Sequence, residues 1–206
     1  MHRNTAELET LLDQILAAPT GTGQLEMIVR RPADRERGVV QKGQLSLEDG
    51  LVGDNWRTRG NAKTEDGAAD PQAQVTLMNS RATDAVATTR DRWALCGDQL
   101  YVDFNLSIDN LPVATRLAVG DAVVEISAKP HTGCAKFSQR FGSEALRFVN
   151  VGIGQANRFR GVTPLWSSQG PWPWVTRSRN SIPPRSRRTS PSSPARTRDV
   201  FFTHFA

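Results

Sequence analysis

Short alternations of apolar and polar residues dominate the middle of the chain. The clearest one runs from Gln99 to Leu106, where the side chains alternate as they do in a half-buried strand. Further short strand-like segments, separated by Gly, Pro, Asp and Asn, lie at 25–29, 45–54, 74–77, 115–121 and 122–127. Turns recur about every ten residues in the most regular part, and this spacing favours a sandwich or barrel over alternating β-α-β units.

Helical periodicity occurs in other segments. In residues 5–16 the apolar side chains recur at i, i+3, i+4 and i+7, which predicts an amphipathic helix that ends before Pro19. Residues 79–93 and 143–149 are also compatible with helices, whereas residues 55–74 are polar and Gly-rich and predict a long loop. The fold class that these patterns predict is mainly β with a few helices, an α+β fold.

The last 44 residues show neither kind of periodicity. Residues 163–206 contain eight Ser, seven of the 12 Pro and seven of the 26 Lys and Arg residues. Such a composition buries too little apolar surface to offset the conformational entropy lost on ordering, so it predicts disorder. The expected organisation is an N-terminal helix in residues 1–21, a β-rich domain in residues 22–162 and a disordered Arg/Ser/Pro-rich tail in residues 163–206.

The positive charge of the chain is concentrated in this tail. The whole sequence has a formal net charge of +5 and a pI near 9.9. The tail holds seven Arg against a single acid, Asp199, which leaves 19 of the 26 basic and 20 of the 21 acidic side chains in residues 1–162. A near-neutral domain argues against a nucleic-acid-binding surface on it, and leaves nucleic acids or acidic proteins as partners of the tail alone.

The sequence also predicts a cytoplasmic protein without a membrane partner. No apolar run approaches the roughly 18 residues that a membrane-spanning helix needs. The first residues lack the basic start and apolar centre of a signal peptide. Two cysteines are too few for a disulfide framework, which fits a reducing compartment.

The stretch that points most clearly to chemistry is 129–137. A Pro and a Gly place Cys134 on a turn soon after the predicted strand 122–127, and turns on a rigid scaffold often carry functional residues. Nearby basic side chains favour the thiolate form of a cysteine, which is the nucleophile and the soft metal ligand. The basic residues here are Lys129, Lys136 and Arg140, and His131 lies three positions before the cysteine.

Two other interpretations compete with a reactive thiol. Cysteine is among the residues most often buried in cores, so an inert Cys134 is the first alternative. A zinc site is the second, and it is disfavoured because such a site needs about four ligands and the chain has three His, two Cys and no CxxC pair. Cys96 lies in no comparable motif, and we interpret it as a packing residue.

Five segments follow one another in a recognisable order: Gly50–Asp54, Gln74–Leu77, Gly97–Leu106, Leu111–Asp121 and Pro130–Cys134. This order resembles the MOSC domain, the C-terminal domain type of molybdenum cofactor sulfurases, which also exists as small standalone proteins. The resemblance covers about residues 22–162.

The resemblance implies a barrel-like β domain that binds the molybdenum cofactor, molybdopterin. It implies that Cys134 is the catalytic residue, as a ligand of molybdenum or as a carrier of a persulfide, and that Asn105 is a polar contact of the cofactor. Some relatives have Arg two positions before this Asn, where the present chain has Asp103. In the family, further apolar strands follow residue 162. The barrel is therefore expected to lack its last strands, and the tail is either replaced, out-of-frame coding sequence or a genuine basic tail.

Other candidates rest on proximity and charge. The expected cofactor-binding residues besides Asn105 are His131, Thr132, Lys136 and Arg140. The first two either bond to the cofactor or stabilise the turn, and the two cations either contact a phosphate or are solvated. Asp54 matches a Gly-Asp turn of the family and is either a site residue or a structural cap. Arg57 and Arg59 lie in the predicted loop, which is able to close over an anionic ligand.

Two functions follow from the resemblance, and both use Cys134. In the first, the protein is a molybdenum-dependent oxidoreductase that reduces small N-hydroxylated compounds with electrons from an external reductase. In the second, it is a non-enzymatic carrier of persulfide sulfur or of the cofactor itself. Binding of an acidic partner through the tail is a third, independent interpretation.

Overall fold

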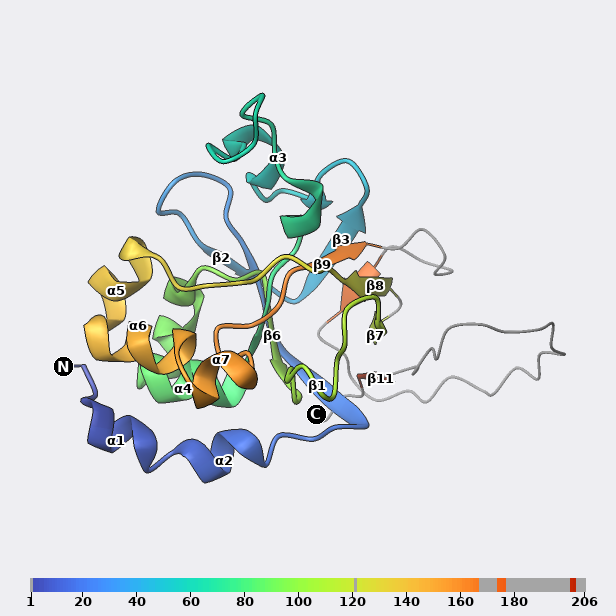
Figure 1. Cartoon of the computed structure of the whole chain (residues 1–206). Helices are drawn as coiled ribbons and strands as arrows, with labels where there is room; N and C mark the ends of the chain where they lie inside the picture. Colours follow the sequence, from blue (N-terminus) through green and yellow to red (C-terminus); the bar gives the residue numbers. More distant parts are fainter. Residues whose placement is uncertain (1, 121, 167–173, 177–200, 203–206) are drawn as a thin grey trace, which may run out of the picture.

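The computed structural model describes residues 2–120, 122–166, 174–176 and 201–202. In it, the β-sheets occupy one side of the molecule and the longer helices gather on the other (Figure 1). The fold class is α+β, as the sequence predicts. Within the residues that the structure describes, no helix is long and apolar enough to cross a membrane.

A sheet built around β1 forms the centre of the fold. β1 (Thr22–Arg30) pairs antiparallel with β6 (Leu100–Asp103) and β2 (Gly38–Val40), and parallel with β11 (Phe201–Phe202). β5 (Leu77–Asn79) extends the sheet beyond β6 and runs parallel to it. Of these strands, β1, β5 and β6 overlap alternating segments of the sequence, whereas β2 has no predicted counterpart.

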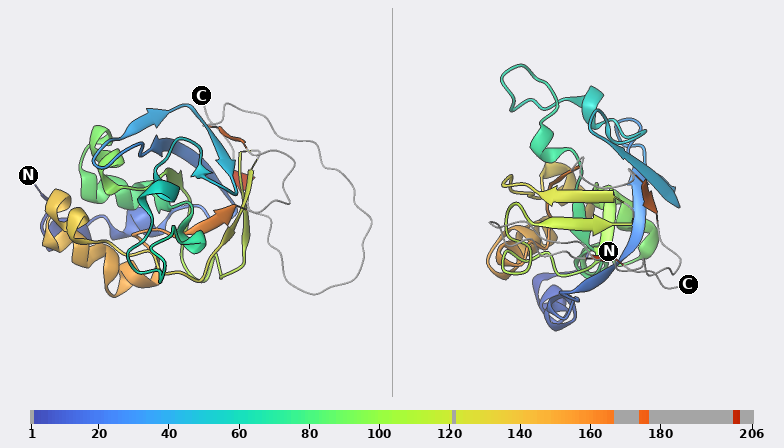
Figure 2. Two further views of the ribbon diagram at one scale, coloured as in Figure 1. Left: turned by 90° about the horizontal axis from the view of Figure 1, so that it is seen from above. Right: turned by 90° about the vertical axis from the view of Figure 1, so that its right-hand side faces the viewer.

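Two smaller sheets complete the β structure. One consists of β10 (Trp174–Thr176), β3 (Lys42–Ser46) and β4 (Gly50–Leu51), and the other of β7 (Arg116–Val119), β8 (Ala122–Ile126) and β9 (Pro164–Trp166). All strand pairs within them are antiparallel. Figure 2 shows the strands curving around a common interior, but none of the described sheets closes into a barrel.

The sheet structure continues beyond the expected domain end at residue 162. The side chain of Thr163 is buried, and its hydroxyl lies 2.9 Å from that of Ser127 and donates to the Lys129 carbonyl at 2.8 Å. Pro164 then opens β9, a position where a strand tolerates a missing N–H. The expectation of disorder is therefore corrected for residues 163–166, and β10 and β11 are also strands. The seven Arg residues of the tail lie outside the described residues.

Helices cover the face of the central sheet that points away from the smaller sheets. They are α1 (Thr5–Glu9), α2 (Leu12–Leu16), α4 (Ser80–Ala87), the 3-10 helix η2 (Arg90–Cys96), α5 (Ala135–Phe141), α6 (Ser143–Asn150) and α7 (Ile153–Ala156). The expected N-terminal helix is thus two short helices. Its cap is Asn4, whose side chain accepts the Glu7 N–H while the Glu7 carboxylate accepts the Asn4 N–H. The predicted loop 55–74 contains α3 (Trp56–Arg59) and the 3-10 helix η1 (Pro71–Ala73).

The central sheet separates two parts of the hydrophobic core. Leu100 and Val102 of β6 belong to the cluster between the sheets, whereas Tyr101 belongs to the cluster beneath the helices. This is the period of two that a strand imposes on its side chains. On β1, Leu25 joins the first cluster and Met27 the second, because the pairing register shifts between these two residues.

Candidate functional site

The segment that joins β8 to α5 crosses the middle of the molecule (Figure 1), and the candidate cysteine, Cys134, lies at its end, directly before α5. Its first part is fixed by Ser127, whose hydroxyl donates to the Gln72 carbonyl at 2.9 Å and accepts the Lys129 N–H at 3.2 Å. We call residues 127–134 the cysteine loop. These bonds anchor the cysteine loop where it leaves the sheet.

The other end of the cysteine loop is held by Asn150 of α6. Its Oδ1 accepts the Gly133 N–H at 2.8 Å, and its Nδ2 donates to the Gly133 carbonyl at 3.3 Å. A Cβ at position 133 would lie 2.6 Å from Leu146 Cδ1, so a larger residue there would require the Leu146 side chain to shift. Cys134 follows as the N-cap of α5, with an exposed side chain that makes no capping bond. It is therefore accessible, whereas Cys96 is buried as the sequence predicts.

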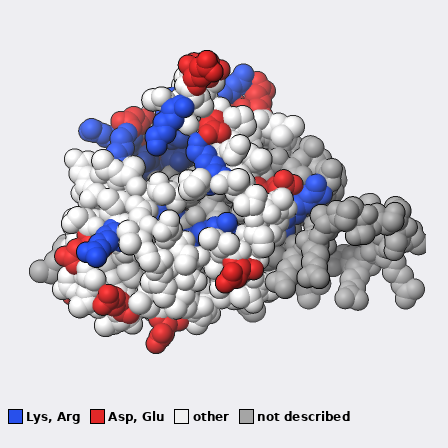
Figure 3. Space-filling model, viewed as in Figure 1, with Lys and Arg blue, Asp and Glu red and all other residues white. Residues whose placement is uncertain are grey.

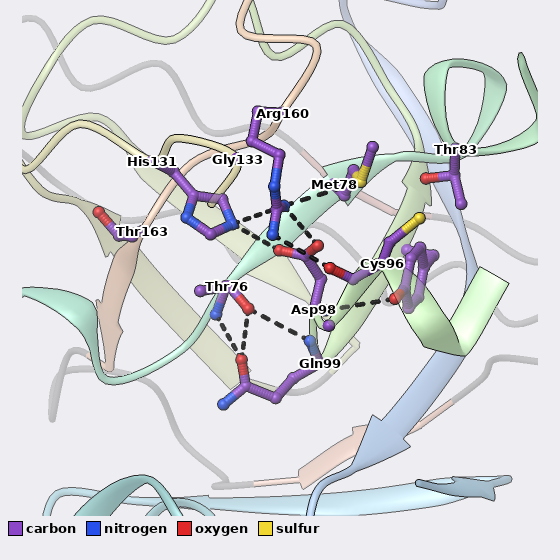
Figure 4. A network of polar contacts seen from close by, with 12 residues as sticks. Thr76, Met78, Thr83, Cys96, Asp98, Gln99, His131, Gly133, Arg160 and Thr163 are labelled. Atoms are coloured by element: carbon purple, nitrogen blue, oxygen red, sulfur yellow. Dashed lines mark hydrogen bonds and ion pairs between the residues drawn. The ribbon is translucent and has the colours of Figure 1, made fainter. Parts of the chain in front are cut away.

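His131 belongs to a polar network beneath the cysteine loop (Figure 4). Its Nε2 lies 2.6 Å from Oδ1 of Asp98 and 2.8 Å from a terminal nitrogen of Arg160. The same Arg160 nitrogen donates to Oδ2 of Asp98 at 2.6 Å, and the second one donates to the Cys96 carbonyl at 3.1 Å. Asp98 is completely buried and Arg160 is 6% exposed, so each charge depends on the other for compensation.

The members of this network determine one another's protonation. Burial alone would raise the pKa of Asp98, but the charge of Arg160 and the contact with His131 outweigh it and lower that pKa to about 2. Burial and the positive charge of Arg160 lower the pKa of His131 below its ordinary value of 6.5. At pH 7 the pair of Asp98 and Arg160 is therefore charged, and the imidazole beside it is neutral.

Four arginines from three segments form a second group, which we call the arginine cluster: Arg31, Arg37, Arg59 and Arg140. Burial and the charges of Arg140 and Arg31 lower the pKa of the Arg37 guanidinium, and burial and the charges of Arg31 and Arg37 lower that of Arg59. Figure 3 shows Lys and Arg side chains gathered in a hollow on the upper part of the molecule. Like charges held together in this way attract anions.

Asp54 balances part of the charge of the arginine cluster. Its side chain is buried, and its two oxygens accept Nε and a terminal nitrogen of Arg31 at 2.8 and 2.9 Å. It also accepts the Trp56 N–H at 3.0 Å, as the expected cap of the turn would. The other three members of the arginine cluster have no carboxylate at ion-pair distance among the described residues.

The other cations singled out in the sequence pair with acids. The pairs are Lys136 with Asp34, Lys129 with Asp70, and Arg57 with Glu48. Of the three basic residues expected around Cys134, Lys129 and Lys136 are therefore neutralised, and Arg140 belongs to the arginine cluster. The Arg140 guanidinium also donates to the Leu95 carbonyl at 2.7 Å, which fixes its position.

Asn105 and Thr132 lie apart from the arginine cluster. Asn105 accepts the Ser107 N–H through its side chain at 2.9 Å, which is an Asx turn, and it lines a narrow gap against α2. No residue of the cysteine loop lines this gap. Thr132 is exposed and lines a different cavity, which it shares with His131.

Several site residues are absent from the sequence-based candidates. They are Arg31 and Arg37 of the arginine cluster, Asp98 and Arg160 of the buried network, and Asn150 beneath the cysteine loop. Asp98 could have been singled out from the sequence, because it lies in the segment Gly97–Leu106 that supports the family resemblance. The others sit in charged or helical stretches whose neighbours are far away in the sequence.

Comparisons with known proteins give a likeness in fold. No family model matches the chain, and no curated protein matches it. The YuaD protein from Bacillus subtilis superposes with a TM-score of 0.52 at 10% sequence identity, over 75% of this chain and 91% of YuaD. YuaD is a MOSC-domain-like protein. The fold is MOSC-like.

Two further solved structures align less closely with this MOSC-like fold. YiiM from Escherichia coli has a TM-score of 0.45 at 17% identity, over 77% of this chain and 72% of YiiM. A hypothetical protein has a TM-score of 0.47 at 18% identity, over 75% of this chain and 65% of its own. At such identities the likeness concerns architecture alone, so the chemistry must be argued from this chain's residues.

Proposed function

We propose that the protein binds the molybdenum cofactor, with its phosphate on the arginine cluster and the Cys134 thiolate as a protein ligand of the metal. The observation that carries the proposal is the ion pair between Lys136 and Asp34, 2.8 Å long. Through this contact the first turn of α5, directly after Cys134, lies beside the segment that bears Arg31 and Arg37. The exposed thiol and the arginine cluster therefore border the same region.

Unsatisfied donors support an anionic ligand at this place. Among the described residues, the Nε atoms of Arg30, Arg37 and Arg160 are buried and have no hydrogen-bond partner, and of these Arg37 belongs to the arginine cluster. A buried donor left unpaired is unfavourable, and a phosphate supplies several acceptor oxygens at once. The arginine cluster thus has the chemistry of a site for an organic phosphate.

The protein ligands available at this place also fit a metal that is already coordinated by its cofactor. The described residues contain no group of three or more His, Cys, Asp and Glu side chains able to hold a metal ion. A single exposed thiolate is nevertheless a suitable soft ligand for a metal that the pterin already chelates. When bound, the cofactor supplies a metal centre that exchanges electrons with a substrate.

The roles of the protein's own residues follow from these contacts. Arg37, Arg59 and Arg140 hold the phosphate, and Cys134 supplies the thiolate. The neutral His131 is able to accept a proton next to the cysteine loop, and Asp98 and Arg160 keep it in place. With an external reductase as the electron donor, these residues suit the reduction of small N-hydroxylated compounds.

A carrier function is the second candidate, and the exposure of Cys134 favours it. Transfer of a persulfide or of the cofactor to another protein requires that the partner reach the thiol, and this side chain is accessible at the start of α5. An enzyme, by contrast, would need the bound cofactor or substrate to cover the thiol.

Two measurements test the proposal and separate the two functions. The first is the molybdenum and pterin content of protein purified from a cofactor-producing host, in wild type and in the Arg37→Gln and Arg140→Gln variants. We expect cofactor in the wild type and a large loss in both variants, with Arg147→Gln, an exposed residue of α6, as the control. Equal content in all four proteins would contradict the role of the arginine cluster.

The second measurement is the reduction of an N-hydroxylated compound by cofactor-loaded protein with a chemical reductant. Turnover would indicate the enzyme, and bound cofactor without turnover would indicate the carrier.

A further inference from the structure

A cavity of about 260 Å³ lies beside the cysteine loop. Its walls come from the cysteine loop, from the end of α6 and from the segment before β9, and include His131, Asn150, Arg158 and Val162. Neither Cys134 nor any member of the arginine cluster lines it. The cavity therefore contains neither the proposed metal ligand nor the proposed phosphate-binding arginines, although it shares His131 with the proposed function.

The cavity contains a positive charge without a counter-charge. The side chain of Arg158 is half-buried, and this burial lowers the pKa of its guanidinium. One terminal nitrogen donates to the Leu111 carbonyl at 2.6 Å, but no acid pairs with Arg158 among the described residues. No Asp or Glu lines the cavity, and the ammonium of Lys129, which also lines it, is already paired with Asp70. A partly desolvated, unpaired cation of this kind favours an anionic ligand.

The remaining walls are partly apolar. Val149 and Val162 are buried beneath the cavity, and Ile108 stands at its edge with 52% of its surface exposed. Ile108 and Val149 therefore offer apolar surface to one part of a ligand, while Arg158 offers a charge to another. The volume is below the range of roughly 300–1,000 Å³ that is typical of drug-sized ligands, so the ligand is small.

We propose that this cavity binds a small organic carboxylate, with the carboxylate on Arg158 and a short apolar body against Ile108 and Val149. The hydroxyl of Thr132 lines the same cavity and is available to a further oxygen of such a molecule. This inference does not depend on the molybdenum cofactor, since none of its residues belongs to the arginine cluster or carries the thiol.

Calorimetric titration with benzoate and its uncharged isostere benzamide tests the proposal in the full-length protein. We expect benzoate to bind at millimolar concentration and benzamide to bind at least about tenfold more weakly, because only the carboxylate forms a charge-assisted pair with Arg158. Arg158→Gln should remove this preference. Ile108→Asp, at an exposed position where folding is not at risk, should weaken benzoate through charge repulsion, and Arg147→Gln should leave its affinity unchanged.

Three results would overturn the proposal. The first is no binding of benzoate at millimolar concentration. The second is equal affinity for benzoate and benzamide. The third is a loss of benzoate binding in Arg37→Gln but not in Arg158→Gln or Ile108→Asp, since that would place the carboxylate on the arginine cluster. None of these results bears on molybdenum content, so this site and the proposed cofactor site fail or succeed separately.

Discussion

At the scale of single residues, the buried network of Asp98, His131 and Arg160 is the part of the site with the largest energetic consequences. A buried carboxylate and a buried guanidinium compensate each other here, and the imidazole contacts both. Removing one partner from such a pair leaves the other charge buried without compensation, which costs about 3–5 kcal/mol in well-studied proteins. Loss of either charged partner should therefore destabilise the region beneath the cysteine loop.

Substitution of Asp98 by Asn should destabilise the protein by about 3–5 kcal/mol, because Arg160 then remains charged in a buried position. Urea denaturation of the variant and of wild type measures this difference. Asp34→Asn is the matched control, since that carboxylate forms an exposed ion pair with Lys136, for which a change of about 1 kcal/mol or less is expected. Equal stability of the two variants would show that Asp98 does not balance Arg160.

The protonation of His131 should make the stability of the protein depend on pH. Its pKa is lowered on folding, so the unfolded chain binds a proton more readily than the native protein does. The native state consequently loses stability as pH falls below the ordinary value of 6.5. We expect the melting temperature of wild type to fall more between about pH 7 and pH 5.5 than that of His131→Gln. His2→Gln, a change at an exposed terminal histidine, serves as the control and should show the same fall as wild type. If the melting temperature of His131→Gln also falls as much as that of wild type, His131 is not the source of the pH dependence.

At the scale of elements, the site depends on how the cysteine loop is clamped between β8 and α6. Asn150 binds both the N–H and the carbonyl of Gly133, directly before the cysteine. The periodicity of residues 143–149 predicts α6 correctly, but no local pattern shows that the amide at its end turns toward a loop 17 positions earlier. Likewise, α5 is absent from the prediction because the loop's Pro and Gly obscure its start and the element has only seven residues.

Replacement of Asn150 by Ala should lower the free energy of unfolding by about 1–3 kcal/mol, because the Gly133 peptide loses both partners. If the cysteine loop positions the thiol for a bound metal, the variant should also retain less molybdenum than its loss of stability explains. Asn157→Ala serves as the control, since that amide bonds to a carbonyl of its own helix at the surface. Metal retention like that of wild type would show that the clamp has a purely structural role.

At the scale of the whole molecule, the sequence predicts the α+β class and the alternating strands, but not which distant segments meet. The strands are visible because a half-buried strand imposes a period of two on residues such as Leu100 to Val102. The arginine cluster has no such signature, since its members lie between positions 31 and 140, on the segment between β1 and β2, on α3 and on α5, and meet only in the folded chain. β9 is too short to show a period, so its role in the sheet also escapes a sequence-based analysis.

The end of the described domain gives a prediction at this scale. A chain truncated after Val162 loses Thr163 and β9, which leaves the ladder edge of β8 unpaired. We expect this protein to be less soluble and to melt at a lower temperature than one truncated after Trp166. Truncated proteins of equal stability would argue that β9 adds nothing to the fold.

In the full chain, Thr163→Ala should lower the free energy of unfolding by about 1–3 kcal/mol, since the hydrogen bonds of the buried Thr163 hydroxyl to the cysteine loop are lost.

The most direct test of the proposed function is the molybdenum-to-protein ratio of Cys134→Ala beside that of Cys96→Ala. Both variants lack one thiol, but only the first loses the exposed thiol at the start of α5, and the second removes a buried one. If Cys134 holds the metal, Cys134→Ala purified from a cofactor-producing host contains little or no molybdenum, while wild type and Cys96→Ala retain it. Cys134→Ala that carries as much molybdenum as wild type would contradict the account.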